Sequence, residues 1–166
     1  MPSSEAPQSW VWVRKCNIRC QLGGLFVDLN GGGGQSPVVI ACKVPRRNEK
    51  NWETNRNQHW HLLAWPLPND SRVIIRSDVT QGLLAADGHG SWVRCEAGNE
   101  WDEQFQWFME GMPVTDSDEH RVVSFRSVKY PKTYLDLWDG KARPGKPFGT
   151  WNGHGGQNQQ FLLWNR

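Results

Sequence analysis

The sequence predicts an all-β domain in which three similar units share one closed core. The first observation is composition, because 11 Trp and 17 Gly in 166 residues favour short strands joined by tight turns over helices. The second is a repeat: an aromatic residue closely preceded by Gln recurs at Trp60, Phe105 and Phe161, each time next to an apolar stretch that ends a unit. These three aromatic residues are therefore predicted to be equivalent core positions.

The length of the chain favours one domain over two. Each repeated unit buries one face and needs the other two units to cover it, so three units form a single core. A chain of 166 residues is enough for one such domain. We expect a tail over residues 1–9 and one domain over residues 10–166, with units near residues 10–66, 67–113 and 114–166.

Each unit is expected to run strand, turn, strand, Gly-rich turn, strand, loop and aromatic-ended strand. The first strand of each unit leads into a basic residue, at Arg14, Arg76 and Arg126. The second strand alternates and places three residues at one shared position, Asp28, Ala85 and Asp136.

One segment of the middle unit also fits a helix. Trp101, Phe105 and Phe108 have helical spacing behind a potential cap at Asn99, so a short helical turn is an alternative there.

Charge and hydropathy exclude several classes of partner. A net charge of +2 gives too little electrostatic attraction to bind nucleic acid or an anionic membrane by charge alone. No apolar run is long enough to cross a bilayer, and Arg14 interrupts the apolar N-terminal stretch before it could act as a signal peptide. We therefore expect a cytoplasmic protein without membrane insertion, whose four cysteines are free thiols.

The third unit carries a family resemblance, in residues 134–140, 145–153 and 158–161. It resembles the β-trefoil lectins of the ricin-B type, and most of all the fungal intracellular galactose-binding lectins. The resemblance implies a β-trefoil with three pseudo-repeats. It also implies a non-catalytic lectin that binds glycans, glycoproteins or glycolipids ending in galactose or N-acetylgalactosamine, with no cofactor and no metal.

A sugar site needs a flat aromatic surface beside fixed hydrogen-bonding groups, because a sugar has an apolar C–H face and a rim of hydroxyls. The third unit supplies a carboxylate at a turn, Asp136, and the resemblance gives Trp151 the role of stacking on the sugar ring. Asn158 can donate to one hydroxyl and accept from another, and Gln159 is expected to brace Asp136. Asn152 either reaches the rim of the sugar or forms the turn.

The other two units keep less of this pattern. In the first, Asp28, Asn57 and Gln58 match the polar residues and predict a weak second site, but Ala41 or Cys42 stands where the ring should be. The second unit has Ala85 in place of the aspartate and Glu103 in place of the asparagine, so it is expected to be structural.

Other functions remain as alternatives. The long loop over residues 43–53, which contains Trp52, fits a β-trefoil protease inhibitor, and the middle unit is similar to fascin-like trefoils that bind actin. The C-x3-C pair Cys16 and Cys20, and the pair His59 and His61, lack further ligands for a metal. No catalytic motif is present, and a homodimer is left open.

Overall fold

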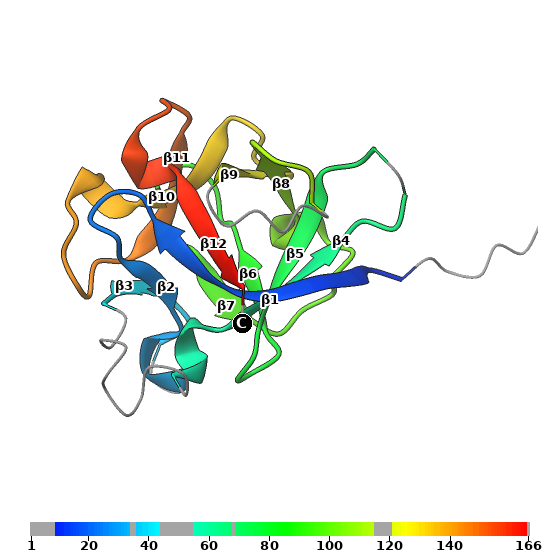
Figure 1. Cartoon of the computed structure of the whole chain (residues 1–166), viewed down its shortest axis with the longest axis horizontal. Helices are drawn as coiled ribbons and strands as arrows, with labels where there is room; N and C mark the ends of the chain where they lie inside the picture. Colours follow the sequence, from blue (N-terminus) through cyan, green and yellow to red (C-terminus); the bar gives the residue numbers. More distant parts are fainter. Residues whose placement is uncertain (1–8, 34–35, 44–54, 68, 115–120, 166) are drawn as a thin grey trace, which may run out of the picture.

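The computed structural model consists of β-strands joined by turns and short 3-10 helices (Figure 1). It describes residues 9–33, 36–43, 55–67, 69–114 and 121–165. Within these ranges, no helix has the length and apolar character that crossing a bilayer requires. Almost all of the predicted N-terminal tail lies outside the described residues, and so does the loop that contains Trp52 beyond Lys43.

Four strands follow one another in each third of the chain, within the predicted units. The first unit contains β1 (Val11–Cys20), β2 (Phe26–Asp28), β3 (Ile40–Cys42) and β4 (Trp60–Ala64). The second contains β5 (Arg72–Ser77), β6 (Leu83–Ala85), β7 (Arg94–Glu96) and β8 (Trp107–Glu110). The third contains β9 (Val122–Ser127), β10 (Thr133–Leu137), β11 (Phe148–Asn152) and β12 (Phe161–Asn165).

Strand pairing repeats three times and closes on itself. The first and fourth strands of the units form a ring of six antiparallel strands, in the order β1, β4, β5, β8, β9, β12 and back to β1. Figure 1 shows the closing pair, with β12 beside β1. The second and third strands form three hairpins, β2–β3, β6–β7 and β10–β11. The described residues form an all-β fold, as predicted, and this arrangement of strands is that of a β-trefoil.

The core lies where the three units meet. Apolar side chains from every unit pack there, among them Leu62, Ile75 and Phe125, all fully buried. Trp60 and Trp107 are also fully buried, and each indole N–H donates to a backbone carbonyl of its own unit, that of Val27 at 2.9 Å or Leu84 at 3.1 Å. A buried indole needs such a partner, so these bonds fix both rings.

The strand register corrects the predicted alignment of the middle unit. Trp60 pairs with Ser77, and the corresponding pair at the next boundary is Trp107 with Ser127. The residue equivalent to Trp60 and Phe161 is therefore Trp107, and the prediction of Phe105 was wrong. Phe105 is buried two positions earlier. The pattern misled because aromatic residues and glutamines alternate in Gln104–Trp107, which makes a two-residue shift invisible in the sequence.

The first unit needs a similar correction. Arg76 and Arg126 pair with the start of the next strand, at Leu83 and Tyr134, and the residue in the same place on β1 is Arg19, which pairs with Phe26. Arg14 was therefore misaligned. It lies earlier on β1, which extends beyond its counterparts to pair with β4.

The helical alternative in the middle unit is reduced to one short turn. A 3-10 helix spans Glu103–Phe105, and the chain then enters β8 at Trp107. Phe108 pairs with Arg126 and lies under its guanidinium, 4.4 Å from the ring centroid. Pairing of β8 with both β5 and β9 explains why the helical spacing does not continue.

Candidate functional site

The most polar buried group of the third unit is the carboxylate of Asp136, on β10. Asp136 pairs across the hairpin with Gly149 of β11. A Cβ atom at Gly149 would lie 2.9 Å from the Trp138 ring and 2.9 Å from the Ser91 carbonyl oxygen, so glycine makes room for Trp138 there. The hairpin therefore places Trp138 beside the carboxylate.

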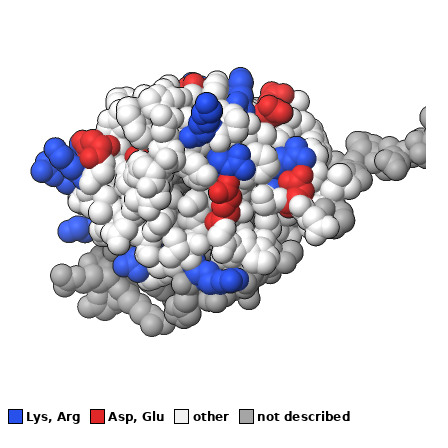
Figure 2. All heavy atoms as spheres, turned by 90° about the horizontal axis from the view of Figure 1, so that it is seen from above, with Lys and Arg blue, Asp and Glu red and all other residues white. Residues whose placement is uncertain are grey.

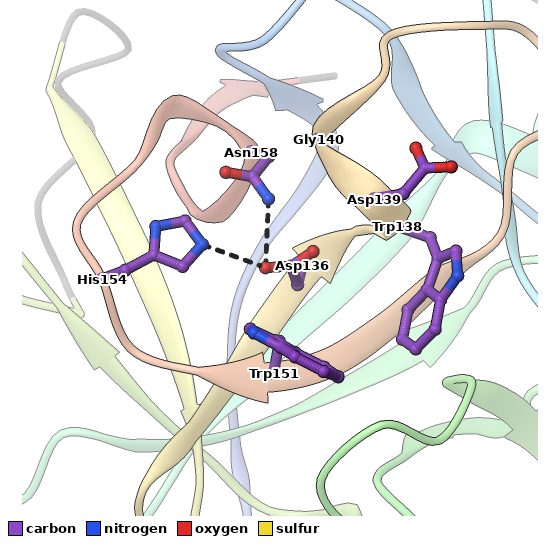
Figure 3. Close-up of a pocket in the computed structure, with 7 residues that line it drawn as sticks. All are labelled: Asp136, Trp138, Asp139, Gly140, Trp151, His154 and Asn158. Carbon is purple, nitrogen blue, oxygen red and sulfur yellow. Dashed lines mark hydrogen bonds and ion pairs between the residues drawn. The ribbon is translucent and has the colours of Figure 1, made fainter.

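Three side chains contact the same oxygen of Asp136, and Figure 3 shows two of them, Asn158 and His154. Gln159 Nε2 donates to Oδ2 at 2.8 Å and Asn158 Nδ2 donates to it at 3.1 Å, while His154 Nε2 lies 3.5 Å away. Among the described residues, no hydrogen bond is made to Oδ1. The carboxylate is thus fixed through one oxygen and retains the other for a ligand.

Burial sets the acidity of this group. Removal from water raises the pKa of Asp136 above its ordinary value, because burial penalises the charged form. Hydrogen bonds from Gln159 and Asn158 and the nearby His154 oppose that shift, since they stabilise the carboxylate. Asp136 is therefore a hydrogen-bond acceptor. As pH falls, it becomes protonated at a higher pH than an ordinary aspartate does.

Aromatic rings line the other side of this carboxylate. Trp151 on β11 is 42% exposed, and in Figure 3 its ring lies flat beneath Asp136 and Asn158. Trp138 meets it edge-on, with ring centroids 5.8 Å apart and planes at 89°. His89, from the second unit, lies 4.1 Å from the Trp151 ring at a tilt of 35°. These two contacts hold the Trp151 ring while leaving it partly open to solvent.

Carboxylate and rings enclose a cavity of about 420 Å³, a size suited to a small ligand. Its lining combines two indole rings with carboxylate, amide and imidazole groups, from Asp136, Trp138, Asp139, Gly140, Trp151, His154 and Asn158. A ligand that fits this lining has one apolar face and several hydrogen-bonding groups.

The predicted site residues divide into two groups. Asp136, Trp151 and Asn158 line the cavity. Gln159 lies behind it, buried, where its amide donates to Asp136 and to the Asn152 carbonyl oxygen at 2.9 Å and accepts from the His154 N–H at 3.1 Å. Asn152 contributes that backbone carbonyl, and its exposed side chain is not part of the lining.

Sequence reasoning missed the residues that turns bring to the cavity. Trp138, Asp139 and Gly140 follow β10 directly, and Asp139 has a φ of 54°, which turns the chain back over the pocket. His154 stands between two glycines, and its Nδ1 accepts from the Gly156 N–H at 3.0 Å. The Asp-Gly pair and the Gly-His-Gly run were local signals of these turns.

The first unit repeats the polar half of the site. Gln58 Nε2 donates to Asp28 Oδ2 at 3.0 Å, and burial raises the pKa of Asp28, opposed by hydrogen bonds from Gln58 and Cys42. Cys42 pairs with Phe26, two residues before Asp28, so Cys42 rather than Ala41 holds the position of the missing ring. Asn57 is half-buried and gives its backbone carbonyl to the Leu29 N–H at 2.8 Å.

The second unit replaces this polar pair with an apolar one. Ala85 stands for the aspartate, and Phe105 stands for the glutamine, and both are buried in one hydrophobic cluster. Glu96, which pairs with Leu83, takes the place of the ring. The corrected register also puts Gln104, and not Glu103 as predicted, at the position of Asn158. The second unit therefore lacks both the carboxylate and the ring at these two positions.

Metal ligation finds no support in the part of the chain that the structure describes, where no three His, Cys, Asp or Glu side chains converge. His61 instead accepts from the Trp12 indole N–H at 3.0 Å and lies 2.8 Å from Asp78. The four cysteines are free thiols. Burial raises the pKa of Cys16 and of Cys20 to about 12, so both remain protonated at neutral pH.

Neither a family model nor a curated protein sequence matches the chain. Among solved structures, the chain is similar to the Rhizoctonia solani agglutinin, at 15% identity and a TM-score of 0.69 over 97% of this chain and 100% of that one. It is similar to the Macrolepiota procera ricin B-like lectin in complex with lactose, at 20% identity and a TM-score of 0.64 over 96% and 99%. The C-half of the earthworm R-type lectin in complex with GalNAc aligns at 17% identity and a TM-score of 0.61 over 92% and 99%.

These likenesses show the fold, which is a β-trefoil. The resemblance found in the third unit is thereby confirmed for the architecture of the whole chain. Whether the chain binds a sugar is a separate question, which the geometry of the cavity addresses.

Proposed function

We propose that the chain is a lectin whose third unit binds a sugar of the galactose or N-acetylgalactosamine type without chemical conversion. The observation that carries this proposal is the state of Asp136. One carboxylate oxygen is held by two amides, the other has no hydrogen bond among the described residues, and an exposed indole ring lies beside it.

The chemistry of a sugar matches each part of the cavity. The Trp151 ring packs against the apolar C–H face. Asp136 Oδ1 accepts hydrogen bonds from hydroxyls, and such charge-assisted bonds are the strong ones. Asn158 gives its N–H groups to Asp136 and to the Leu137 carbonyl oxygen, at 3.1 and 3.4 Å, which leaves its amide oxygen for a further hydroxyl.

A galactose-type sugar suits this arrangement for a stereochemical reason. Its axial O4 lies on one face of the ring, so the opposite face presents a continuous apolar patch to an indole. O3 and O4 then reach the carboxylate together. The similar structures that hold lactose, which ends in galactose, and GalNAc support the same class of sugar.

Binding without hydrolysis is proposed from the state of the two carboxylates at the cavity. Hydrolysis of a glycosidic bond requires two carboxyl groups that flank it as acid and as base or nucleophile. Asp136 supplies only one such group, with one oxygen held by two amide donors and the other open to a sugar hydroxyl. Asp139 is held by Lys146 Nζ at 2.6 Å and by the Lys141 N–H at 3.1 Å, and its pKa is lowered by these contacts. A carboxylate paired in this way is a poor proton donor.

A glycan array tests the proposal, with the wild-type chain and the Asp136→Asn variant applied in parallel. Wild-type signals are expected on glycans that end in galactose or N-acetylgalactosamine, and the variant should lose them. A blank wild-type array would refute the lectin function. Equal signals from both proteins would refute the assignment of the site to Asp136.

A further inference from the structure

A second cavity lies beside the first, lined by residues of the third unit and by Glu110 of β8. It has a volume of about 450 Å³, close to the 420 Å³ of the cavity at Asp136. Glu110, Ser124, Lys132, Tyr134 and Gly155 contribute to its wall, and so does His154, which lines both cavities. The two cavities are therefore adjacent at His154, and a ligand that extends past its imidazole would occupy both.

The two cavities follow the same face of one strand. Tyr134 and Asp136 are two residues apart on β10, so their side chains point to the same side, about 7 Å apart along the strand. Tyr134 pairs with Trp151 across the hairpin. One aromatic residue of this cross-strand pair lines the second cavity and the other lines the first. The separation is comparable to the length of one hexose in a chain.

Polar groups in the second cavity are held in place. The Tyr134 hydroxyl donates to Glu110 Oε2 at 3.2 Å, and Arg126 pairs with the other carboxylate oxygen. Each carboxylate oxygen can accept a second hydrogen bond, so Glu110 can still receive one from a ligand hydroxyl. Lys132 adds an exposed ammonium group. The lining thus carries one negative and one positive charge beside a hydroxyl at Ser124.

Two glycines, Gly153 and Gly155, line the second cavity on either side of His154. A Cβ atom at Gly155 would meet nothing within 4 Å, and its φ of +70° is a conformation that side chains rarely adopt. A Cβ atom at Gly153 would lie 2.5 Å from the Tyr134 ring. The backbone at Gly153 therefore packs directly against the Tyr134 ring, and no side chain at Gly155 extends into the cavity.

We propose that this cavity is a second subsite, which binds a neutral hexose linked to the sugar at Asp136, so that the protein recognises a disaccharide rather than a single terminal residue. The balance of charge in the lining favours a neutral polyhydroxyl group. The proposal rests on the proposed lectin function, because the first sugar positions the second.

Titration calorimetry tests the subsite with methyl β-galactoside and a panel of galactose-terminated disaccharides of every linkage position. At least one disaccharide is expected to bind about tenfold more tightly than the monosaccharide, the equivalent of one or two net hydrogen bonds. Lys132→Ala and Ser124→Phe should remove that gain and leave monosaccharide affinity unchanged. Lys129→Ala, an exposed lysine outside both linings, is the matched control and should change neither.

The outcomes separate the two proposals. Equal affinity for the monosaccharide and every disaccharide would overturn the subsite and leave the lectin function standing. A Lys132→Ala variant that loses both kinds of sugar equally, or neither, would also overturn the subsite. If the wild type binds no sugar at all, both proposals fail. Lys132 is exposed, so its variant is informative even where Ser124→Phe melts at a lower temperature.

Discussion

Cys42 in the first unit occupies the position that Trp151 occupies in the third. Each pairs across its hairpin with the residue two places before the aspartate. A thiol offers no flat face to a sugar, although the Asp28–Gln58 bond of 3.0 Å repeats the Asp136–Gln159 bond of 2.8 Å. Among the described residues, the polar half of the site therefore exists twice, and the aromatic half exists once.

The number of sites follows from this difference. We expect one strong site per chain, with any binding at Asp28, Asn57 and Gln58 at least about tenfold weaker, because the aromatic contact is missing. Asp28→Asn should leave the strong site unchanged. Calorimetric stoichiometry, measured together with solution mass by light scattering, checks this. Two equal sites per chain would contradict it, and agglutination by a monomer would too, because cross-linking requires two sites or a dimer.

Asp136→Asn should separate binding from stability. The asparagine side chain can still accept from Gln159 and Asn158 with its oxygen, but its amide replaces the free acceptor and removes the charge. Loss of a charge-assisted hydrogen bond costs about 1.5–3 kcal/mol, so affinity should fall roughly tenfold to a hundredfold.

The same variant should be at least as stable as the wild type at neutral pH. Because the folded-state pKa of Asp136 is raised, the folded protein binds more protons than the unfolded chain, and stability falls as pH rises from 3.8 through the raised value. Asparagine removes that cost. Thermal melts at neutral pH check this, and a large drop in melting temperature would show that the charge supports the fold.

Sugar binding should weaken in acid. The carboxylate is the acceptor, and it is protonated as pH falls through the raised pKa of Asp136, at higher pH than for an ordinary aspartate. Dissociation constants measured from neutral pH downwards should therefore rise before melts show unfolding. The Asp136→Asn variant is the control, since its weak residual binding should lack this titration.

Trp151→Ala should abolish most of the binding while preserving the fold, because the side chain is 42% exposed. Removing a stacked ring should cost at least tenfold in affinity, about 1.4 kcal/mol. Trp12→Ala is the matched control, because Trp12 is 58% exposed and lies on β1, outside the cavity lining. Equal losses in the two variants would indicate a general effect of removing surface indoles.

Phe105→Ala should destabilise the chain without direct effect on the site. Phe105 is buried and fills the space that glutamine fills in the other units, and Phe→Ala in a core costs about 3–5 kcal/mol. Trp101→Ala, at a ring that is 40% exposed, should cost less. Chemical denaturation measures both. Sugar affinity of the folded Phe105→Ala protein should equal that of the wild type.

The sequence was sufficient to predict the all-β fold and three of the cavity-lining residues, because both depend on local order. Asp136, Trp151 and Asn158 lie within one unit and follow a pattern of strand, turn and strand. The strand register of the middle unit could not be predicted from the sequence in the same way. Strand pairing chose Trp107 over Phe105, and both are aromatic residues next to a glutamine.

The remaining parts of the site depend on tertiary structure. His154 reaches Asp136 only because a glycine-rich turn folds it back over the strand end. His89 comes from another unit, and nothing in its own neighbourhood marks it as a partner of Trp151. Contacts across unit boundaries have no signature in a sequence read one unit at a time.

The segment over residues 88–93 gives the second unit a supporting role at the site of the third unit, although the second unit lacks the matching carboxylate and ring itself. Its backbone bonds to β11 through Gly90 N–H to Thr150 oxygen at 2.8 Å and Thr150 N–H to Ser91 oxygen at 3.0 Å, and His89 lies against the ring that faces the ligand. The second unit thus supports the Trp151 ring of its neighbour. The third unit is then not a portable module: excised or grafted elsewhere, it would carry every residue that lines the cavity at Asp136 and still lack the support that aligns its indole.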